Sequence, residues 1–435
     1  MTMAHDWRSG RCRTGGRRVA AATVIALALG VTACSSSAAS PTTTAGATAV
    51  AVHTFYTPPS PLPAAAPGTL IRSAEVTGVP EVPARARVWR IIYHSTTVSG
   101  ADVAESGYVI APSTPAPAGG YPVIAWAHGT TGFAAPCAPS LFTGPGGGSG
   151  PYLLPSLAVY LAAGYVVSAA DYQGLGVADG VHPYLLGSSE GRSVLDATRA
   201  TRQIAGLRTA DTVVIYGHSQ GGHAALFAAE MAPTYAPDLH VIGVVAAAPA
   251  TGLSTIIATI GTSLGTQFLA YTIPTAYSWT KAYPDLPSSV VFTPAGEAFA
   301  SAEVTRGCAD QVAEAVMAHH LTAGAVFTAT AASDPTVQAH ARANDPGDVR
   351  TPVPMLVVQG TADRTVPSPL TDTYVTTKAC PIGDTVQYLH VTGATHGTVV
   401  IESAPTIVAW MNARLAGSPA PTTCGRPGDV ADFVP

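Results

Sequence analysis

Charged residues are scarce in this chain of 435 residues. They make up 11% of the sequence, and the formal net charge is −5 at pH 7. Nucleic-acid-binding domains neutralise phosphates with clustered lysine and arginine side chains, so this composition predicts no nucleic-acid partner. Internal repeats are also absent. The residues from about 70 onward are enough for one large domain with an insertion.

CxxC spacing, which is typical of zinc sites and thioredoxin-like redox sites, does not occur among the six cysteines. A zinc or thioredoxin-like site is therefore not expected, and no metal or organic cofactor is predicted. Cys12 and Cys34 belong to the N-terminal segment, which leaves an even set of four. In an exported protein such a set suggests two disulfides, with three possible connectivities among Cys137, Cys308, Cys380 and Cys424.

The N-terminus resembles an export signal. Five arginines precede an apolar stretch, residues 19–31, that is too short to span a bilayer comfortably and has the form of a signal-peptide core. The stretch ends in Val31-Thr32-Ala33-Cys34, which resembles a bacterial lipobox. This interpretation predicts cleavage before Cys34 and attachment of a diacylglyceryl anchor to it, which would hold the protein at a membrane. The alternative is an ordinary secretory signal cleaved near Ala33.

Composition divides the rest of the chain. After the signal peptide, residues 1–33, the segment 34–69 consists mainly of Ser, Thr, Ala and Pro, cannot bury a core, and is expected to be a flexible tether behind the lipidated cysteine. The main domain is predicted from two segments, residues 70–249 and 353–435. Between them, residues 250–352 contain no clear strand and are predicted to form a helical cap.

Apolar and β-branched runs alternate with helical patterns over most of the domain. The first runs lack helices between them and predict an antiparallel start, whereas the later alternation predicts a parallel sheet with helices on both faces. The expected strands are 88–93, 104–111, 121–127, 164–169, 212–216, 241–248, 353–359 and 385–391. The expected helices are 151–163, 190–206, 220–232, 368–378 and 398–414.

The first part of the predicted cap, residues 251–280, carries no charge until Lys281. A membrane span is the alternative interpretation, but the Gly, Thr and Gln content and Pro274 argue against it. A helix that is apolar on most sides is better buried over an apolar pocket.

The sequence TVVIYGHSQGGHAALFAAE, from Thr212 to Glu230, joins a buried strand to a helix through a tight turn that contains Ser219. This context makes a serine a nucleophile, because the strained turn lifts its hydroxyl clear of the sheet and points the helix N-terminus at it. The glycines at 217, 221 and 222 are expected to allow the backbone and the helix to pass closely.

A second Gly-x-Ser-x-Gly pattern occurs at residues 187–191. The residues before it, HPYLL, include Pro183 and no β-branched residue, which argues against a central strand. There we expect Ser189 to be a helix N-cap, with Glu190 in the first turn, where a negative charge suits the helix dipole.

A serine nucleophile needs a histidine that takes its proton and an acid that orients the histidine. In this strand and helix pattern the acid follows the next-to-last strand and the histidine follows the last. Asp363 and His396 occupy these positions, and Asp372 and Asp384 are the alternative acids. Two other histidines, His390 inside the last predicted strand and His223 one turn after the serine, are expected to be packing residues.

Ester hydrolysis also needs donors for the oxyanion that forms on the attacked carbonyl. One is expected to be the backbone N–H of Gln220, at the N-terminus of the helix. The other is expected at the end of an earlier strand, in AHGTTG, from the backbone N–H of Thr130, with Gly129 as the competing choice.

Five segments together, AHGTTG, DYQGLGVADGVHPYLLGSSEGRSVLDATRA, YGHSQGGHAA, QGTADRTVP and TGATHG, resemble the secretory lipase family of α/β-hydrolases, to which yeast-type lipase A belongs. The likeness covers most of residues 70–415, and the block that begins at Asp171 is its most specific part. It implies an exported lipase or esterase with the triad Ser219, Asp363 and His396, and a large helical cap. It also implies that the block at Asp171 shapes a wall near the oxyanion turn, and that the disulfides are 137 with 308 and 380 with 424.

We therefore expect an α/β-hydrolase fold and an exported, lipid-anchored serine ester hydrolase. The expected substrates are carboxylic or triacylglycerol esters with apolar acyl chains, and no protein partner is predicted. One alternative keeps the triad but transfers the acyl group to an alcohol or sugar. Another is a surface lipoprotein that binds a lipid and has lost turnover, and peptidase activity is also compatible with the fold.

Overall fold

A computed structural model describes residues 54–142, 153–178, 180–260, 262, 268–425 and 431–433. The predicted signal peptide, the lipobox and Cys34 lie outside these residues.

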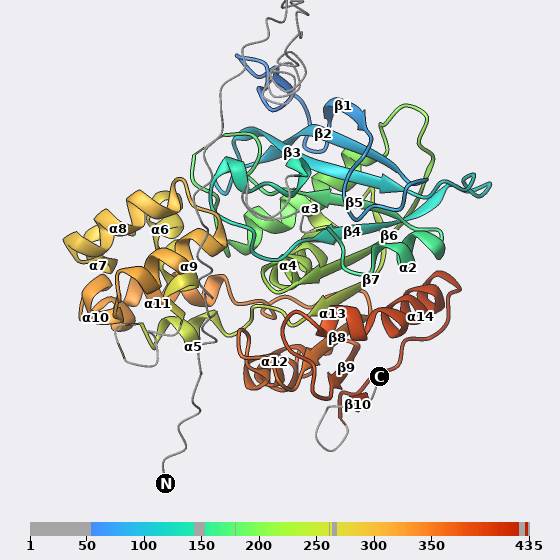
Figure 1. Cartoon of the computed structure of the whole chain (residues 1–435). Helices are drawn as coiled ribbons and strands as arrows, with labels where there is room; N and C mark the ends of the chain where they lie inside the picture. The colour runs from blue at the N-terminus through green and yellow to red at the C-terminus, as the bar shows by residue number, and fades with distance from the viewer. Residues whose placement is uncertain are drawn as a thin grey trace, which may run out of the picture. The chain divides into compact units, whose positions relative to one another are not determined.

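The domain is built on a ten-stranded sheet with the strand order β1-β2-β3-β5-β4-β6-β7-β8-β9-β10 (Figure 1). As predicted, β1, β2 and β3 pair antiparallel, and the strands from β5 to β10 pair parallel. The strands are β1 Leu70–Val76, β2 Arg87–Thr96, β3 Asp102–Ala111, β4 Tyr121–Ala127, β5 Val166–Ala170, β6 Thr209–His218, β7 His240–Ala247, β8 Met355–Gly360, β9 Val386–Val391 and β10 Ala431–Phe433.

The central strands are apolar because the sheet is covered on both faces. Along β4, Val123 and Ala125 enter the core of one face, whereas Ile124 and Trp126 enter the core of the other. Helices α3, α4 and α12 pack on the first face, and α2, α13 and α14 pack on the second. These helices are α2 Leu157–Ala162, α3 Gly187–Thr201, α4 Gln220–Tyr235, α12 Ser368–Tyr374, α13 Val399–Glu402 and α14 Ala404–Leu415.

The segment between β7 and β8 is helical, as predicted, and its helices lie together to one side of the sheet (Figure 1). They share an apolar core of their own that includes Trp279, Phe292 and Phe327. The helices are α5 Leu253–Ile257, α6 Leu269–Ala282, α7 Ser288–Val291, α8 Pro294–Val304, α9 Ala309–Ala318, α10 Ala323–Val326 and α11 Pro335–Ala343. We call residues 250–352 the cap.

The predicted tether, residues 34–69, extends too far toward the C-terminus. Residues 54–69 pack on the domain: the Tyr56 hydroxyl lies 2.6 Å from Ser140 Oγ, and the ring is buried. The Gly68 N–H donates to the His94 carbonyl. Contacts such as those of Tyr56 and Gly68 therefore hold residues 54–69 on the domain, although the composition of this segment is of low complexity.

Two disulfides are present, with the pairing that the family resemblance implies. Cys137 and Cys308 join the segment after β4 to the start of α9, and Cys380 and Cys424 join the segment after α12 to the C-terminal segment. The first bond links the cap covalently to the segment that follows the turn with the candidate oxyanion donor. The second fastens the strand that precedes His396, because the Thr423 N–H next to Cys424 donates to Val386 of β9.

Glu105 of β3 is a buried carboxyl away from the candidate site, and burial raises its pKa to about 8. Between its ordinary pKa of 4.5 and about 8, the folded state holds a proton that the unfolded state has released, so folding stability falls as pH rises through this window. We expect Glu105→Gln to match the wild type below pH 4.5 and to be more stable near pH 8, by on the order of a few kcal/mol. Denaturant unfolding at several pH values measures the difference, and a variant that gains nothing at pH 8 contradicts it.

Candidate active site

Ser219 occupies the sharp turn between β6 and α4. Its backbone angles, φ 60° and ψ −120°, are unusual for a residue with a side chain and are typical of a nucleophile held in a strained strand-to-helix turn. Surrounding backbone holds the turn: the Ser219 N–H donates to Ala247, and its carbonyl accepts from Ala250 and His223.

The three glycines of the turn are required by close approach. A Cβ on Gly217 would overlap the Gly221 carbonyl, and one on Gly221 would overlap the Ala127 carbonyl at the end of β4. A Cβ on Gly222 would lie 2.7 Å from Pro249 Cα. The glycines therefore bring the end of β4 and the segment after β7 against the start of α4, as predicted.

Asp363 and His396 meet beyond the C-terminal ends of β8 and β9. His396 Nδ1 lies 2.7 Å from Asp363 Oδ2. The two loops are held together by the Ala362 N–H, which donates to Ala394, and a Cβ on Gly360 would overlap the same carbonyl. The parallel order of the strands thus brings together two side chains that are 33 residues apart.

The carboxylate of Asp363 is fixed by four donors. Oδ1 accepts from the backbone N–H groups of Thr365 and Val366, and Oδ2 accepts from the Gln359 amide and from His396. Burial alone would raise the pKa of Asp363, but the hydrogen bond and the charge of His396 and the two backbone donors keep it below its usual value. An ionised Asp363 accepts a hydrogen bond from Nδ1 of His396, so the neutral ring carries its proton on Nδ1. Nε2 is then unprotonated and available as a base.

His218, the residue before Ser219, connects the turn of Ser219 to His396. The imidazole of His396 packs against the His218 ring, with 4.6 Å between the ring centroids. Within the described residues, no hydrogen bond joins the Ser219 hydroxyl to His396. The contact between them therefore stays a prediction; such contacts are often long before a substrate is bound.

The contact of His218 with His396 was not predicted from the sequence. His218 is buried, and its Nε2 lies 2.9 Å from the His396 carbonyl. Burial, with the nearby His396, lowers the pKa of His218 to about 3, so the ring is neutral at ordinary pH and donates from Nε2. It holds the loop of His396 beside the turn of Ser219.

The turn after β4 lies against the start of α4. Ala127 of β4 is paired with Gly217 of β6, so the segment that follows each strand begins at the same edge of the sheet. In the part of the chain that the structure describes, no backbone hydrogen bond outside the regular helices and strands uses the N–H of Gln220 or Thr130. Their role as oxyanion donors stays a prediction. The Thr130 hydroxyl lies 2.7 Å from the Tyr184 hydroxyl.

The block at Asp171 supports this turn, as the resemblance implies. The Tyr172 hydroxyl donates to the His128 carbonyl over 3.0 Å, and the rings of Tyr172 and His128 lie 4.4 Å apart. Asp171 is buried and accepts from the Ser106 hydroxyl over 2.6 Å and from the Ser140 N–H over 2.9 Å. A buried hydrogen-bonded carboxyl thus anchors the wall behind the oxyanion turn.

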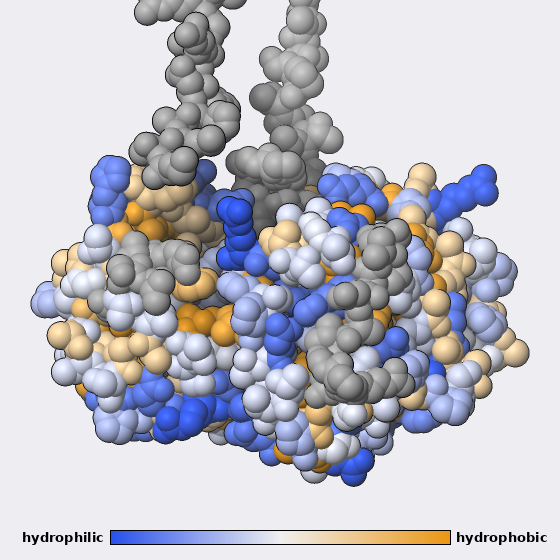
Figure 2. Space-filling model, turned by 90° about the horizontal axis from the view of Figure 1, so that it is seen from below, coloured by the Kyte–Doolittle hydropathy of each residue, from blue (hydrophilic) through white to orange (hydrophobic). Residues whose placement is uncertain are grey.

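A small cavity of about 50 Å³ opens beside Ser219. Its lining is mostly apolar and comes from both the main domain and the cap: Tyr184, Leu185, Ser219, Ala250, Leu253, Ile256, Ile257, Phe268, Tyr271, Thr272, Thr275, Thr365 and Val366. Figure 2 shows apolar residues gathered on the lobe that holds the cap helices of Figure 1. The uncharged segment that begins the cap therefore lines an apolar site, as predicted.

The other residues considered from the sequence lie elsewhere. Asp372 contacts His390 and the Tyr388 hydroxyl, and Asp384 accepts from the Thr351 N–H, so neither alternative acid contacts His396. His390 is in β9, as predicted.

The prediction of Ser189 as an N-cap is wrong. Helix α3 begins at Gly187 with Leu186 as its N-cap, and Ser189 is buried within the first turn. Glu190 is in that turn, as predicted, but it is buried, and its carboxylate accepts from the Leu185 N–H inside the protein. The helix therefore starts three residues earlier than predicted, with this internal acceptor in its first turn.

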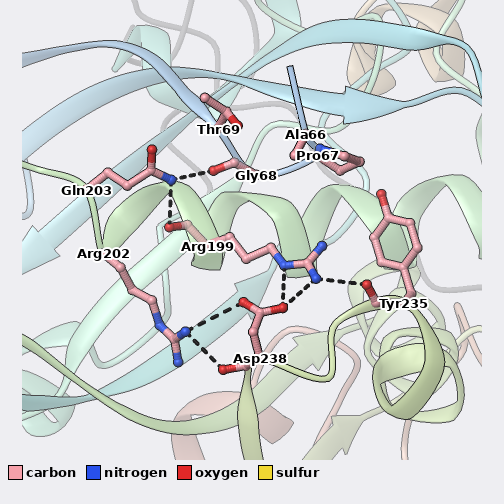
Figure 3. Close-up of a pocket in the computed structure, with 9 residues that line it drawn as sticks. All are labelled: Ala66, Pro67, Gly68, Thr69, Arg199, Arg202, Gln203, Tyr235 and Asp238. Carbon is pink, nitrogen blue, oxygen red and sulfur yellow. Dashed lines mark hydrogen bonds and ion pairs between the residues drawn. The ribbon is translucent and has the colours of Figure 1, made fainter. Parts of the chain in front are cut away.

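A separate groove of about 520 Å³ lies where residues 66–69 cross α3 (Figure 3). Its arginines are paired: Arg199 donates to Asp238 and to the Tyr235 carbonyl, and Arg202 donates to the Asp238 carbonyl. The two arginines that line the groove are therefore both paired, and the N-terminal segment is held there by the Gln203 amide, which donates to the Gly68 carbonyl.

The described residues contain no cluster of three or more His, Cys, Asp or Glu residues arranged to hold a metal ion. They also contain no helix that is both long and apolar enough to cross a membrane.

The fold and the strand, turn and helix around Ser219 define an α/β-hydrolase. The sequence model of the secretory lipase family matches residues 153–423, and the chain belongs to this family. Membership supports hydrolysis of lipid esters as the class of activity and export as the route of the protein.

Known proteins agree with this assignment. Lipase A of Arthroderma benhamiae is 25% identical over 83% of this chain and 79% of its own length. A Mycobacterium tuberculosis protein described as a probable inactive lipase is 30% identical, but the match spans only 45% of this chain and 44% of that protein. The crystal structure of Candida antarctica lipase A has the same fold, with a TM-score of 0.72 at 21% identity over 88% of this chain and 89% of that chain.

Proposed function

We propose that the protein is a serine ester hydrolase with Ser219 as nucleophile, His396 as general base and Asp363 as the acid that orients it. The observation that carries this proposal is the Asp363 to His396 hydrogen bond of 2.7 Å, formed beside a serine in a strained turn. The proposed oxyanion donors are the backbone N–H groups of Gln220 and Thr130.

In the proposed reaction, His396 Nε2 takes the Ser219 proton as the hydroxyl oxygen attacks the ester carbonyl. The oxyanion accepts from the two backbone donors, each of which typically contributes about 3 kcal/mol to lowering the barrier. His396 then gives its proton to the alkoxide oxygen of the ester, which leaves as an alcohol, and the acyl group remains bound to Ser219 as an acyl-enzyme. Water activated by His396 then releases the carboxylic acid and restores the enzyme.

The lining of the cavity favours esters with apolar acyl chains. A volume of about 50 Å³ is far smaller than a typical ligand pocket of roughly 300–1,000 Å³. We expect kcat/KM in a series of nitrophenyl esters to be highest for short acyl chains in solution, and to fall for chains that need the cap helices to separate. Stopped assays across acetate to palmitate measure this, and a maximum at palmitate in monomeric solution contradicts it.

We also propose that the protein is exported and tethered to a membrane by a diacylglyceryl group on Cys34, with the segment between Cys34 and residue 54 as the spacer. The lipobox and the preceding apolar stretch support this. Cys34→Ser is expected to move the protein from the membrane fraction to the soluble exported fraction. Quantitative immunoblotting of the two fractions tests it, and an unchanged membrane share contradicts the anchor.

A second candidate function is lipid binding without turnover. The relative that is described as a probable inactive lipase favours it. In this chain the hydrogen-bonded Asp363 and His396 and the strained Ser219 count against it. The same ester series separates the two, because a lipid-binding protein would give no product that depends on Ser219.

A further inference from the structure

A cluster of buried polar side chains lies directly behind the proposed oxyanion site. Each of its members is at most 3% exposed. Buried polar groups are costly unless they are hydrogen-bonded, so the partners of each atom reveal what the cluster holds in place. The members are His182 before α3, Glu190 of α3, Gln220 and His223 of α4, and Asn344 at the end of α11.

Glu190 connects the two sides of the site. Its Oε1 accepts from the Gln220 side-chain amide over 2.7 Å and from the Leu185 N–H over 2.8 Å. Gln220 carries one proposed oxyanion donor on its backbone. Leu185 follows Tyr184, whose hydroxyl contacts Thr130, the residue of the other proposed donor.

The hydrogen bonds of His223 define its charge. Nδ1 lies 3.0 Å from Glu190 Oε2, and Nε2 lies 2.8 Å from the Asn344 carbonyl oxygen. A carbonyl oxygen only accepts, and so does an ionised carboxylate, so with Glu190 ionised both ring nitrogens of His223 carry a proton. The resulting imidazolium balances the buried carboxylate, and an isolated charge in this position would be costly.

His182 completes the support of Gln220. Its Nδ1 lies 2.9 Å from the Gln173 carbonyl and donates to it, so Nε2 accepts from the Gln220 amide, 2.8 Å away. Both hydrogens of the Gln220 amide are therefore used, one by His182 and one by Glu190. The side chain cannot rotate without breaking a buried bond, and its backbone N–H is fixed with it.

We propose that Glu190 is a positioning residue for the oxyanion site, which it holds by binding Gln220 on one side and Leu185 on the other while paired with a charged His223. This inference rests on the proposed function. Through the Asn344 carbonyl, the same pair also fixes the end of the cap to the helix that follows the nucleophile.

The test compares four variants by steady-state hydrolysis of nitrophenyl butyrate. Glu190→Ala is expected to lower kcat by about 10- to 100-fold with KM within about twofold, because donors aimed at the transition state are lost. Gln220→Met, which leaves Glu190 in place, is expected to lower kcat by about 10-fold.

Glu190→Gln is expected to stay within about threefold of the wild type, because its amide oxygen accepts from both donors and its amide group donates to a neutral His223. Glu105→Ala removes an equally buried glutamate that does not contact the cluster, and its kcat should be unchanged.

Wild-type kcat in Gln220→Met or in a folded Glu190→Ala overturns the inference, and so does a Glu190→Gln variant as slow as Glu190→Ala. If Glu190→Ala does not fold, Gln220→Met decides. A higher KM at constant kcat also contradicts it, because that pattern marks lost substrate binding.

Nitrogen-15 NMR of the histidine side chains provides a readout without turnover. We expect a doubly protonated His223 in the wild type at pH 8 and a neutral one in Glu190→Gln. A neutral His223 in the wild type contradicts the charged pair. Wild-type activity in Ser219→Ala would contradict the proposed function. If Ser219 is required but the cluster variants remain fully active, only the positioning role is contradicted.

Discussion

Ser219→Ala is expected to reduce kcat for nitrophenyl butyrate by at least about 10⁴-fold, because removal of the nucleophile leaves only binding and the oxyanion donors to accelerate hydrolysis. Stability should change little, since the half-buried hydroxyl makes no hydrogen bond to any residue that the structure describes. Steady-state kinetics, with a thermal melt of each protein, measures both effects.

Ser189→Ala is the matched control, because Ser189 is the serine of the second Gly-x-Ser-x-Gly pattern. Its hydroxyl is buried in α3 and donates to the Gln173 amide oxygen over a long distance of 3.4 Å. Activity within about twofold of the wild type is expected. Equal losses in the two variants would show that the assay reports on folding and not on the nucleophile.

Asp363→Asn is expected to lower kcat by about 10³- to 10⁴-fold with little change in KM. The amide group that replaces Oδ2 would face His396 Nδ1 as a donor, so the ring would carry its proton on Nε2. The base would then be blocked on the side of Ser219. The measurement is kcat and KM at several pH values for the purified variant.

Asp372→Asn tests the alternative acid under the same conditions. Asp372 binds Tyr388 and His390 rather than His396, so activity within about twofold of the wild type is expected. Should Asp372→Asn lose as much activity as Asp363→Asn, the assignment of the acid would be wrong.

Local pattern was enough to predict the central sheet. The runs that became β4, β6 and β8 are short, β-branched and bounded by turn residues, which is what burial on both faces requires. Strand β1 was missed because its polar residues alternate with apolar ones at a half-exposed edge, and β10 because it has only three residues. The order of strands also placed Asp363 and His396 correctly beside each other.

The contacts that support the candidate site were not predictable in the same way. His182 and Glu190 are 38 and 30 residues from Gln220, and nothing local shows that they bind its amide or that the Asn344 carbonyl binds His223. Glu190 was predicted at a helix start for its favourable charge, whereas the structure buries it. Long-range burial of polar groups depends on how the cap packs on α3 and α4, and residue spacing does not record that packing.

The central claim is that Ser219 is activated by His396, and a fluorophosphonate probe tests it most directly. Mass spectrometry of the labelled protein should find one adduct, on Ser219, in the wild type, none in Ser219→Ala, and labelling slowed by about 10²-fold or more in Asp363→Asn. An unlabelled wild type, or an adduct on any other residue, would contradict the account.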